Sequence, residues 1–151
     1  MLYLGADHRG FGLKESLKRY LTKQGVLFED FGAANLVPGD DYVDYGLAVA
    51  KAVANDPEAH RGVLICGSGI GMSIVANKVK GVRAALVTEL RQAVAARADD
   101  DANVLVLEAD TTTPDHGIEK VEKWLNTPFS GAERHQRRLD KIKELEEESF
   151  C

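Results

Sequence analysis

Short apolar runs alternate with longer amphipathic segments along the 151-residue chain. The apolar runs have the length of buried strands, and the amphipathic segments repeat apolar residues at helical spacing. The run at 62–66 is apolar throughout, which is typical of a parallel strand covered on both faces. We expect strands at 2–4, 26–28, 62–66, 83–87 and 104–107, and helices at 10–24, 42–54, from 67–71 to about 78, 90–98, 115–125 and 131–148.

This alternation with short connections predicts a parallel sheet joined by right-handed crossovers. The expected fold is a three-layer α/β/α sandwich, with a five-stranded parallel Rossmann-like sheet and a C-terminal helix. We expect residues 1–151 to form one domain, with the helix at about 131–151. Ligands bind at the carboxyl ends of such strands, near a switch in strand order. We expect Asp7, His8, Cys66 and the segment 99–103 to lie there.

The composition is typical of a globular protein, with 44% hydrophobic and 28% charged residues. The net charge of −5 argues against nucleic acid as the main partner. No signal peptide or membrane-spanning run is visible, which favours the cytoplasm. Cys66 and Cys151 do not form the pattern of a disulfide framework or a zinc site, and the sequence gives no role for Cys151.

The strongest chemical signal is the stretch Cys-Gly-Ser-Gly-Ile-Gly at 66–71. Its three glycines allow a tight turn whose backbone N–H groups point inward at the start of a helix. Such a loop can bind an anion and favours a reactive thiol beside it. A lone cysteine is more often a small core residue, but directly before this loop we favour a functional role for Cys66.

Three other clusters are more ambiguous. Asp7 and His8 follow the first strand, where they could reach a ligand, although Asp7 could equally cap a helix. Arg134 and Arg138 share one helix face and suit a phosphate, although a solvated face paired with neighbouring acids is more common. The acids at 99–101 usually form a solvated loop, and an acid–base role requires one of them to enter the pocket.

Taken together, these motifs resemble the ribose-5-phosphate isomerase B family, which also includes the subunits of galactose-6-phosphate isomerase. The resemblance covers residues 3 to about 142. Its most specific part is the stretch at 63–73, and several ordered motifs are far more specific together than any one alone. The others lie at 5–8, 30–32, 76–78, 81–84, 103–105 and 131–138.

The resemblance implies a cofactor-free and metal-free conversion of an aldose phosphate to a ketose phosphate through an enediolate, with ribose 5-phosphate and ribulose 5-phosphate as the expected pair. It also implies a homodimer, or a tetramer, with each site shared between subunits. Cys66 would take the proton and Asp7 would bind sugar hydroxyls. His8 would grip the phosphate with Arg134 and Arg138 of the partner. The implied contacts also include Gly67, Ser68, Gly69, Ile70, Gly71 and Asp100.

This chain departs from the family pattern at several positions. Asp99 stands where the family carries a histidine that opens the sugar ring, and Asp100 replaces an asparagine. Asp110 stands where the family carries a phosphate-binding arginine. Met72 stands where one branch carries a glutamate base, which leaves Cys66 as the candidate base. We therefore expect proton abstraction to survive and ring opening and phosphate placement to change, with Asp99 as a candidate proton-transfer group.

Three alternatives remain open. The substrate could be another pentose or hexose phosphate, or the protein could bind a sugar phosphate with reduced catalysis. A nucleotide-binding module is a third possibility, because Glu89 lies at a suitable distance after the glycine loop for a ribose contact. The loop reads Gly-x-Gly-x-Gly, however, and the chain is too short to add a substrate domain.

Overall fold

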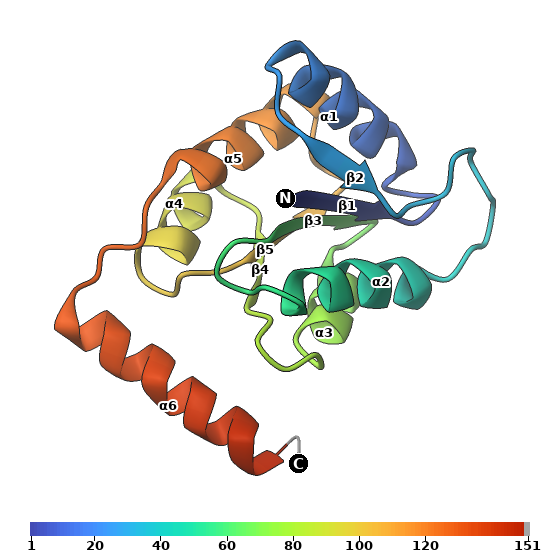
Figure 1. The fold of residues 1–151 in the computed structure, drawn as a ribbon. Coiled ribbons are helices and arrows are strands. Elements are labelled where there is room, and N and C mark those ends of the chain that lie inside the picture. Colours follow the sequence, from blue (N-terminus) through green and yellow to red (C-terminus); the bar gives the residue numbers. More distant parts are fainter. Residues whose placement is uncertain (150–151) are drawn as a thin grey trace.

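The computed structural model describes residues 1–149, and Cys151 lies outside this range. The described residues form alternating strands and helices, as the sequence predicts (Figure 1). The strands are β1 (Leu2–Ala6), β2 (Phe28–Asp30), β3 (Arg61–Cys66), β4 (Ala84–Val87) and β5 (Val104–Glu108). The helices are α1 (Phe11–Lys23), α2 (Tyr42–Ala54), α3 (Ile70–Ala76), α4 (Leu90–Ala98), α5 (Pro114–Asn126) and α6 (Glu133–Ser149).

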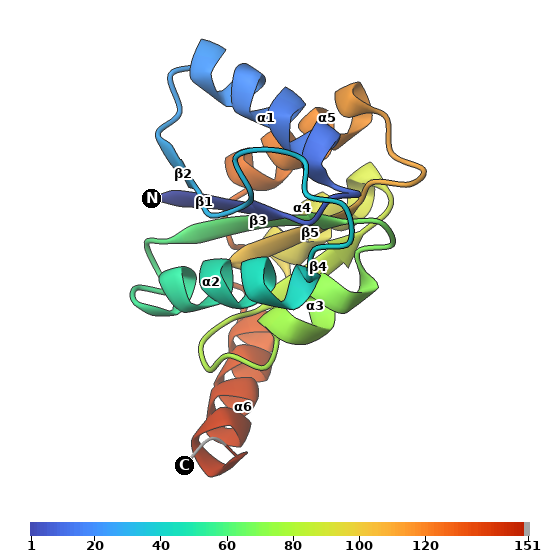
Figure 2. The same ribbon diagram turned by 90° about the vertical axis from the view of Figure 1, so that its right-hand side faces the viewer.

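The five strands form one parallel sheet in the order β2-β1-β3-β5-β4. Helices α1, α4 and α5 cover one face, and α2 and α3 cover the other, which confirms the three-layer sandwich (Figures 1 and 2). The chain leaves β1 toward one side of the sheet and leaves β3 toward the other. The switch in strand order therefore falls between β1 and β3, where ligands bind in such folds.

Two apolar clusters fill the space between the layers. Trp124 of α5 is fully buried in one cluster, and Met72 of α3 is fully buried in the other. The strand β3 contributes to both, because its side chains alternate between the faces of the sheet. The central strands are thereby fixed on both sides, and the residues that follow them have defined positions.

Several predicted boundaries differ from the structure by one or two residues, and two of these differences have a local cause. The second strand begins at Phe28 and not at 26, because Gly25 adopts a φ of +70° and the Val26 amide returns to the Leu21 carbonyl at 3.0 Å. The helix after the glycine loop ends at Ala76 and not near 78. The side chain of Asn77 ends it, by donating to the Ser73 and Ala84 carbonyls and accepting from the Ala84 amide.

Helix α6 extends away from the sandwich, whereas α1 to α5 pack against the sheet (Figures 1 and 2). One of its residues, Glu146, accepts a hydrogen bond from the Gly81 amide at 3.1 Å. No helix within residues 1–149 is long and apolar enough to cross a membrane.

Candidate active site

The carboxyl ends of β1 and β3 bring Cys66 beside the loop of residues 67–71, here called the glycine loop. Cys66 is the last residue of β3 and is 5% exposed. The Gly69 amide donates a hydrogen bond to its sulfur at 3.2 Å. The thiol is therefore held against the loop at the switch in strand order, where the sequence predicts it.

Glycine is required at position 69 of this loop for two reasons. Its φ is +76°, which side-chain-bearing residues rarely adopt. A Cβ atom there would also lie 2.3 Å from Cδ1 of Leu86. The next amide, of Ile70, points back to the Ser68 hydroxyl at 3.3 Å. The loop thus turns tightly enough to gather its backbone amides above the end of β3.

Asp7 shapes the turn after β1 and is 6% exposed. Its Oδ1 accepts hydrogen bonds from the amides of Arg9 and Gly10, each at 3.0 Å. These donors lie just before the first residue of α1, so this contact resembles the capping alternative. The carboxylate is nevertheless at the end of β1, next to the ladder that joins β1 to β3.

His8 is oriented by Asp40, a residue that the sequence analysis did not single out. Both the backbone amide and Nδ1 of His8 lie 2.8 Å from Asp40 Oδ1. Because the carboxylate accepts, Nδ1 carries a proton, and Nε2 is left for a ligand. Burial by itself would raise the pKa of Asp40. The hydrogen bonds from the His8 amide, the His8 ring and the Tyr45 hydroxyl have the larger combined effect, so the pKa of Asp40 is lowered. Burial and the Asp40 charge together raise the pKa of Tyr45.

Arg9 and Asp110 meet over the glycine loop. The Nη2 atom of Arg9 contacts Oδ2 of Asp110 in an ion pair. The loop that follows β5 is hydrogen-bonded to the glycine loop, because the amides of Ala109 and Asp110 donate to the Gly67 carbonyl at 3.0 and 3.1 Å. Arg9 was not among the predicted site residues, although it directly follows Asp7 and His8 in the sequence.

Asp99 and Asp100 lie elsewhere, and the prediction that segment 99–103 falls at the carboxyl ends of the strands is wrong. This segment precedes β5, so it lies where the parallel strands begin, here called the amino edge. Asp99 ends α4, is half exposed at its side chain and lies 3.6 Å from Nε2 of His135. In one chain, Asp99 and Cys66 are therefore at opposite edges of the sheet.

Arg134 and Arg138 are exposed on α6 and also lie away from Cys66. Neither forms an ion pair with any residue that the structure describes. Between them, His135 is 5% exposed and meets the Ser130 hydroxyl at 2.7 Å through Nδ1. His135 anchors the start of α6, and the two arginines on either side remain available to a ligand or a partner.

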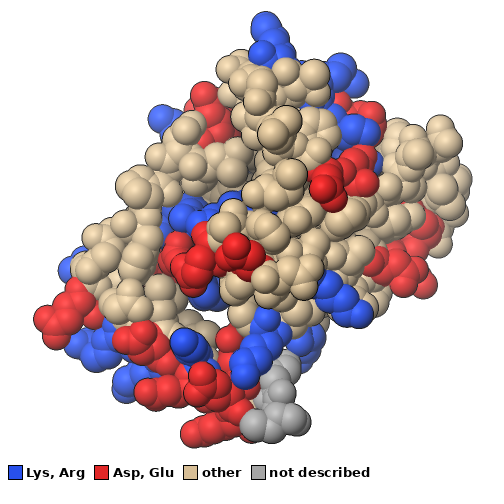
Figure 3. All heavy atoms as spheres, viewed as in Figure 1, with Lys and Arg blue, Asp and Glu red and all other residues tan. Residues whose placement is uncertain are grey.

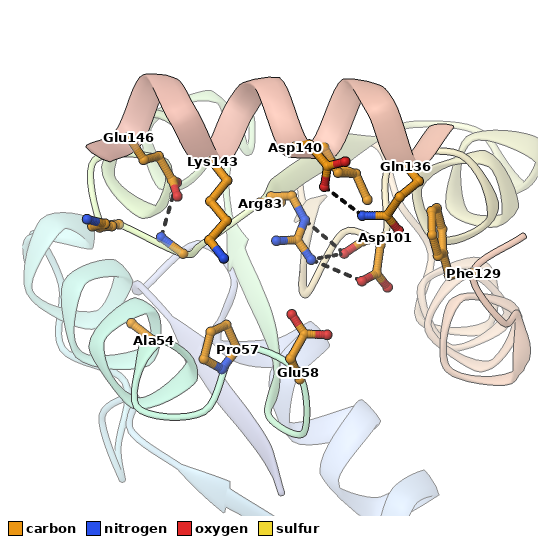
Figure 4. Close-up of a pocket in the computed structure, with 13 residues that line it drawn as sticks. Ala54, Pro57, Glu58, Arg83, Asp101, Phe129, Gln136, Asp140, Lys143 and Glu146 are labelled. Carbon is orange, nitrogen blue, oxygen red and sulfur yellow. Dashed lines mark hydrogen bonds and ion pairs between the residues drawn. The ribbon is translucent and has the colours of Figure 1, made fainter. Parts of the chain in front are cut away.

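A cavity of about 610 Å³ also lies at the amino edge. Figure 3 shows charged side chains of both signs along α6 and a hollow between this helix and the sandwich. Figure 4 shows this cavity between α6 and the loops before β3, β4 and β5; its labelled lining residues are Ala54, Pro57, Glu58, Arg83, Asp101, Phe129, Gln136, Asp140, Lys143 and Glu146.

Within residues 1–149, no group of three or more His, Cys, Asp or Glu side chains is placed to hold a metal ion. The groups gathered at the switch in strand order are instead a thiol, backbone amides, a carboxylate and an oriented imidazole. These groups can move a proton and bind hydroxyl and anionic oxygens. The fold and this edge define an α/β protein with a small-molecule site at the carboxyl ends of β1 and β3.

The known proteins that resemble this chain are α/β proteins of the same class, and they identify its family. A family model described as Ribose/Galactose Isomerase matches residues 2–142. The chain belongs to this family, and the resemblance noted in the sequence is confirmed.

Individual relatives match over nearly the whole chain. A probable ribose-5-phosphate isomerase B from Mycoplasma pneumoniae is 40% identical over 147 residues, which cover 97% of this chain and 95% of the relative. A crystal structure of ribose-5-phosphate isomerase B from Mycoplasma genitalium with bound ribulose-5-phosphate superposes with a TM-score of 0.95 at 39% identity, covering 98% and 97% of the two chains. The type B enzyme from Trypanosoma brucei is 48% identical with a TM-score of 0.86, covering 95% and 97%.

Proposed function

We propose that this chain is an aldose–ketose isomerase that interconverts ribose 5-phosphate and ribulose 5-phosphate. The observation that carries this proposal is the Cys66 thiol, held by the Gly69 amide beside the glycine loop at the switch between β1 and β3. The names of the relatives support the same substrate pair. A reducing compartment such as the cytoplasm would keep this thiol free.

In the proposed reaction, the Cys66 thiolate takes a proton from the carbon next to the carbonyl. As the S–H bond forms, the electrons of the broken C–H bond enter the enediolate, whose oxyanion is stabilised by the remaining amides of the glycine loop. The thiol then returns the proton to the former carbonyl carbon. The hydroxyl proton on the adjacent carbon moves to the oxygen of the former carbonyl, so that the carbonyl group is re-formed one carbon along and the thiolate is regenerated. Asp7 and Ser68 bind sugar oxygens, and His8, which Asp40 orients through Nδ1, donates an Nε2–H to the phosphate.

The proposed site is completed by a second copy of the chain. Arg134, Arg138 and Asp99 are too far from Cys66 in one chain, because they lie at the opposite edge of the sheet. Helix α6 turns one face toward its own cavity and leaves Ile142 and Leu145 exposed, at 40% and 60%. The sandwich itself exposes a second apolar set around α2 and α3 that could receive a partner: Leu36, Val37, Tyr42, Val43, Ile70 and Ile74.

In this arrangement, residues 1–151 form one domain whose C-terminal helix serves the partner's site. Arg134 and Arg138 would grip the phosphate, and their spacing of four residues puts both guanidinium groups on one helix face. Asp99 would transfer the proton that opens the sugar ring, with Asp100 contacting the substrate beside it. The half-exposed carboxylate of Asp99 is accessible for that role.

The direct test is turnover of ribose 5-phosphate by the wild type and by Cys66→Ala. We expect Cys66→Ala to lower kcat by about 1,000-fold, because the proton acceptor is removed. Cys151→Ala is the matched control, since it removes the other thiol and should turn over like the wild type.

Equal activity of Cys66→Ala and wild type would remove Cys66 as the base. If the wild type is inactive on ribose 5-phosphate but active on another pentose or hexose phosphate, the proposed substrate is wrong and that sugar phosphate takes its place. Binding of ribose 5-phosphate without turnover of any sugar phosphate would identify a binding protein that lacks the isomerase activity.

A further inference from the structure

Arg9 lies directly on the glycine loop. A Cβ atom added to Gly67 would come within 2.4 Å of Arg9 Cζ and 2.5 Å of Arg9 Nε. The guanidinium group therefore occupies the space that any other residue at position 67 would fill. Its side chain is 55% exposed, so the group rests on the loop with one side open to a ligand.

Asp110 holds this guanidinium in place. The carboxylate bonds to Nη2 of Arg9, and the backbone amide of Asp110 donates to the Gly67 carbonyl at 3.1 Å. Both members of the pair are thus anchored on the same residue, Gly67. A guanidinium fixed at one nitrogen keeps its other N–H donors in a known plane, which favours bidentate recognition of an anion.

The charges nearby show what this cation is suited to bind. Four acids belong to this edge of the sheet: Asp7, Asp40, Glu108 and Asp110. A phosphate dianion approaching Cys66 would meet repulsion from these groups, and a positive charge on the loop offsets it. Arg9 provides this charge from the same chain as the thiol.

We propose that Arg9 is a further substrate-binding residue, which donates hydrogen bonds to the phosphate of the sugar phosphate, and that Asp110 is its positioning residue. This inference rests on the proposed function and deepens it. It also gives Asp110 a role that its charge alone does not suggest, since the acid reaches the phosphate only through Arg9.

The test compares wild type with Arg9→Ala, Arg9→Lys and Asp110→Asn. The matched control is Arg91→Ala, because Arg91 forms an exposed ion pair with Glu89 at the carboxyl end of β4. The readouts are KM and kcat for ribose 5-phosphate, kcat/KM for unphosphorylated ribose, and the dissociation constant of inorganic phosphate by calorimetry.

We expect Arg9→Ala to raise KM for ribose 5-phosphate by about 10- to 100-fold, the usual cost of a hydrogen bond to a charged group. It should weaken inorganic phosphate binding similarly and leave kcat/KM for ribose unchanged. Arg9→Lys should recover part of the loss, because it keeps the charge without the fork. Asp110→Asn should raise KM by a smaller factor, and Arg91→Ala should match the wild type.

Equal affinity of wild type and Arg9→Ala for inorganic phosphate would overturn the inference, as would equal losses on ribose and ribose 5-phosphate. The phosphate affinities are independent of the proposed function. A wild type that turns over no sugar phosphate would refute the isomerase, and the role of Arg9 as an anion-binding residue would still be decided by the phosphate affinities.

Discussion

At the carboxyl edge of the sheet, Asp7 and Asp40 bind backbone amides and a histidine beside a buried thiol. At the amino edge, Asp101 is bound by Arg83 and Arg97, whereas among residues 1–149 the side chain of the nearby Asp99 has only a contact of 3.6 Å to His135. The carboxyl edge is organised within one chain. At the amino edge, one acid is fixed and its neighbour is available.

This difference separates acids that support the fold from an acid that is left accessible. Asp101 adopts a φ of +44° and receives hydrogen bonds from two guanidinium groups, at 3.1 Å from Arg83 and 2.5 Å from Arg97. Arg97 is only 8% exposed, so its charge depends on this partner. Asp99, two residues earlier, ends α4 and has no comparable support. Two residues of one acidic run therefore differ, since Asp101 supports the fold and Asp99 is accessible.

Two variants, Asp99→Asn and Asp101→Asn, test the difference between these acids, and the largest effect is expected on the activity of Asp99→Asn. Removing the Asp99 carboxylate should lower kcat for ribose 5-phosphate by about 100-fold, because proton transfer in ring opening is lost. The free energy of unfolding of Asp99→Asn should stay near that of the wild type, since the Asp99 side chain is half exposed. Steady-state kinetics and urea unfolding of both variants measure the two effects.

Asp101→Asn should behave in the opposite way. It leaves the Arg97 guanidinium without its carboxylate and should lower the free energy of unfolding by about 1 to 3 kcal/mol. Asparagine tolerates the positive φ, so the folded variant should keep its kcat. Full activity of Asp99→Asn together with full stability of Asp101→Asn would contradict the proposed difference between a reactive Asp99 and a structural Asp101.

A smaller effect is expected from Asp40→Asn at the carboxyl edge. The pKa of Asp40 is lowered in the folded state, so its stabilising contribution is complete above its ordinary value of 3.8 and is lost as the pH falls through the lower folded value. The variant should be less stable than the wild type by about 1 kcal/mol at neutral pH. Urea unfolding below pH 3.8 should show this gap closing, and a gap that is constant with pH would contradict the assignment.

The sequence predicted the layers of the fold because hydrophobic periodicity reports directly on burial. The runs at 62–66 and 104–107 are buried central strands, and the helices at 42–54 and 90–98 have the predicted bounds. The errors arose where local side-chain contacts overrule periodicity, as at Gly25 and Asn77.

The candidate site was predictable only in part. Cys66 was identified because it ends a strand directly before the glycine loop, and Asp7 because it directly follows a strand. The position of Asp99 was misplaced because residues before a parallel strand lie at the edge opposite to those after it. Asp40 and Arg9 were missed because their roles depend on contacts across 32 and 101 positions, to His8 and Asp110. Local spacing does not record contacts of that range.

The most direct test of the proposed shared site is mixing of two inactive variants. Cys66→Ala lacks the base, and the double variant Arg134→Ala, Arg138→Ala lacks the phosphate grip; each alone should be inactive. In a dimer with exchanged subunits, one of the two sites in every mixed dimer would combine an intact Cys66 with intact arginines, so random mixing should restore about a quarter of wild-type turnover. No recovery in mixed dimers isolated by two affinity tags would contradict a site shared between two copies.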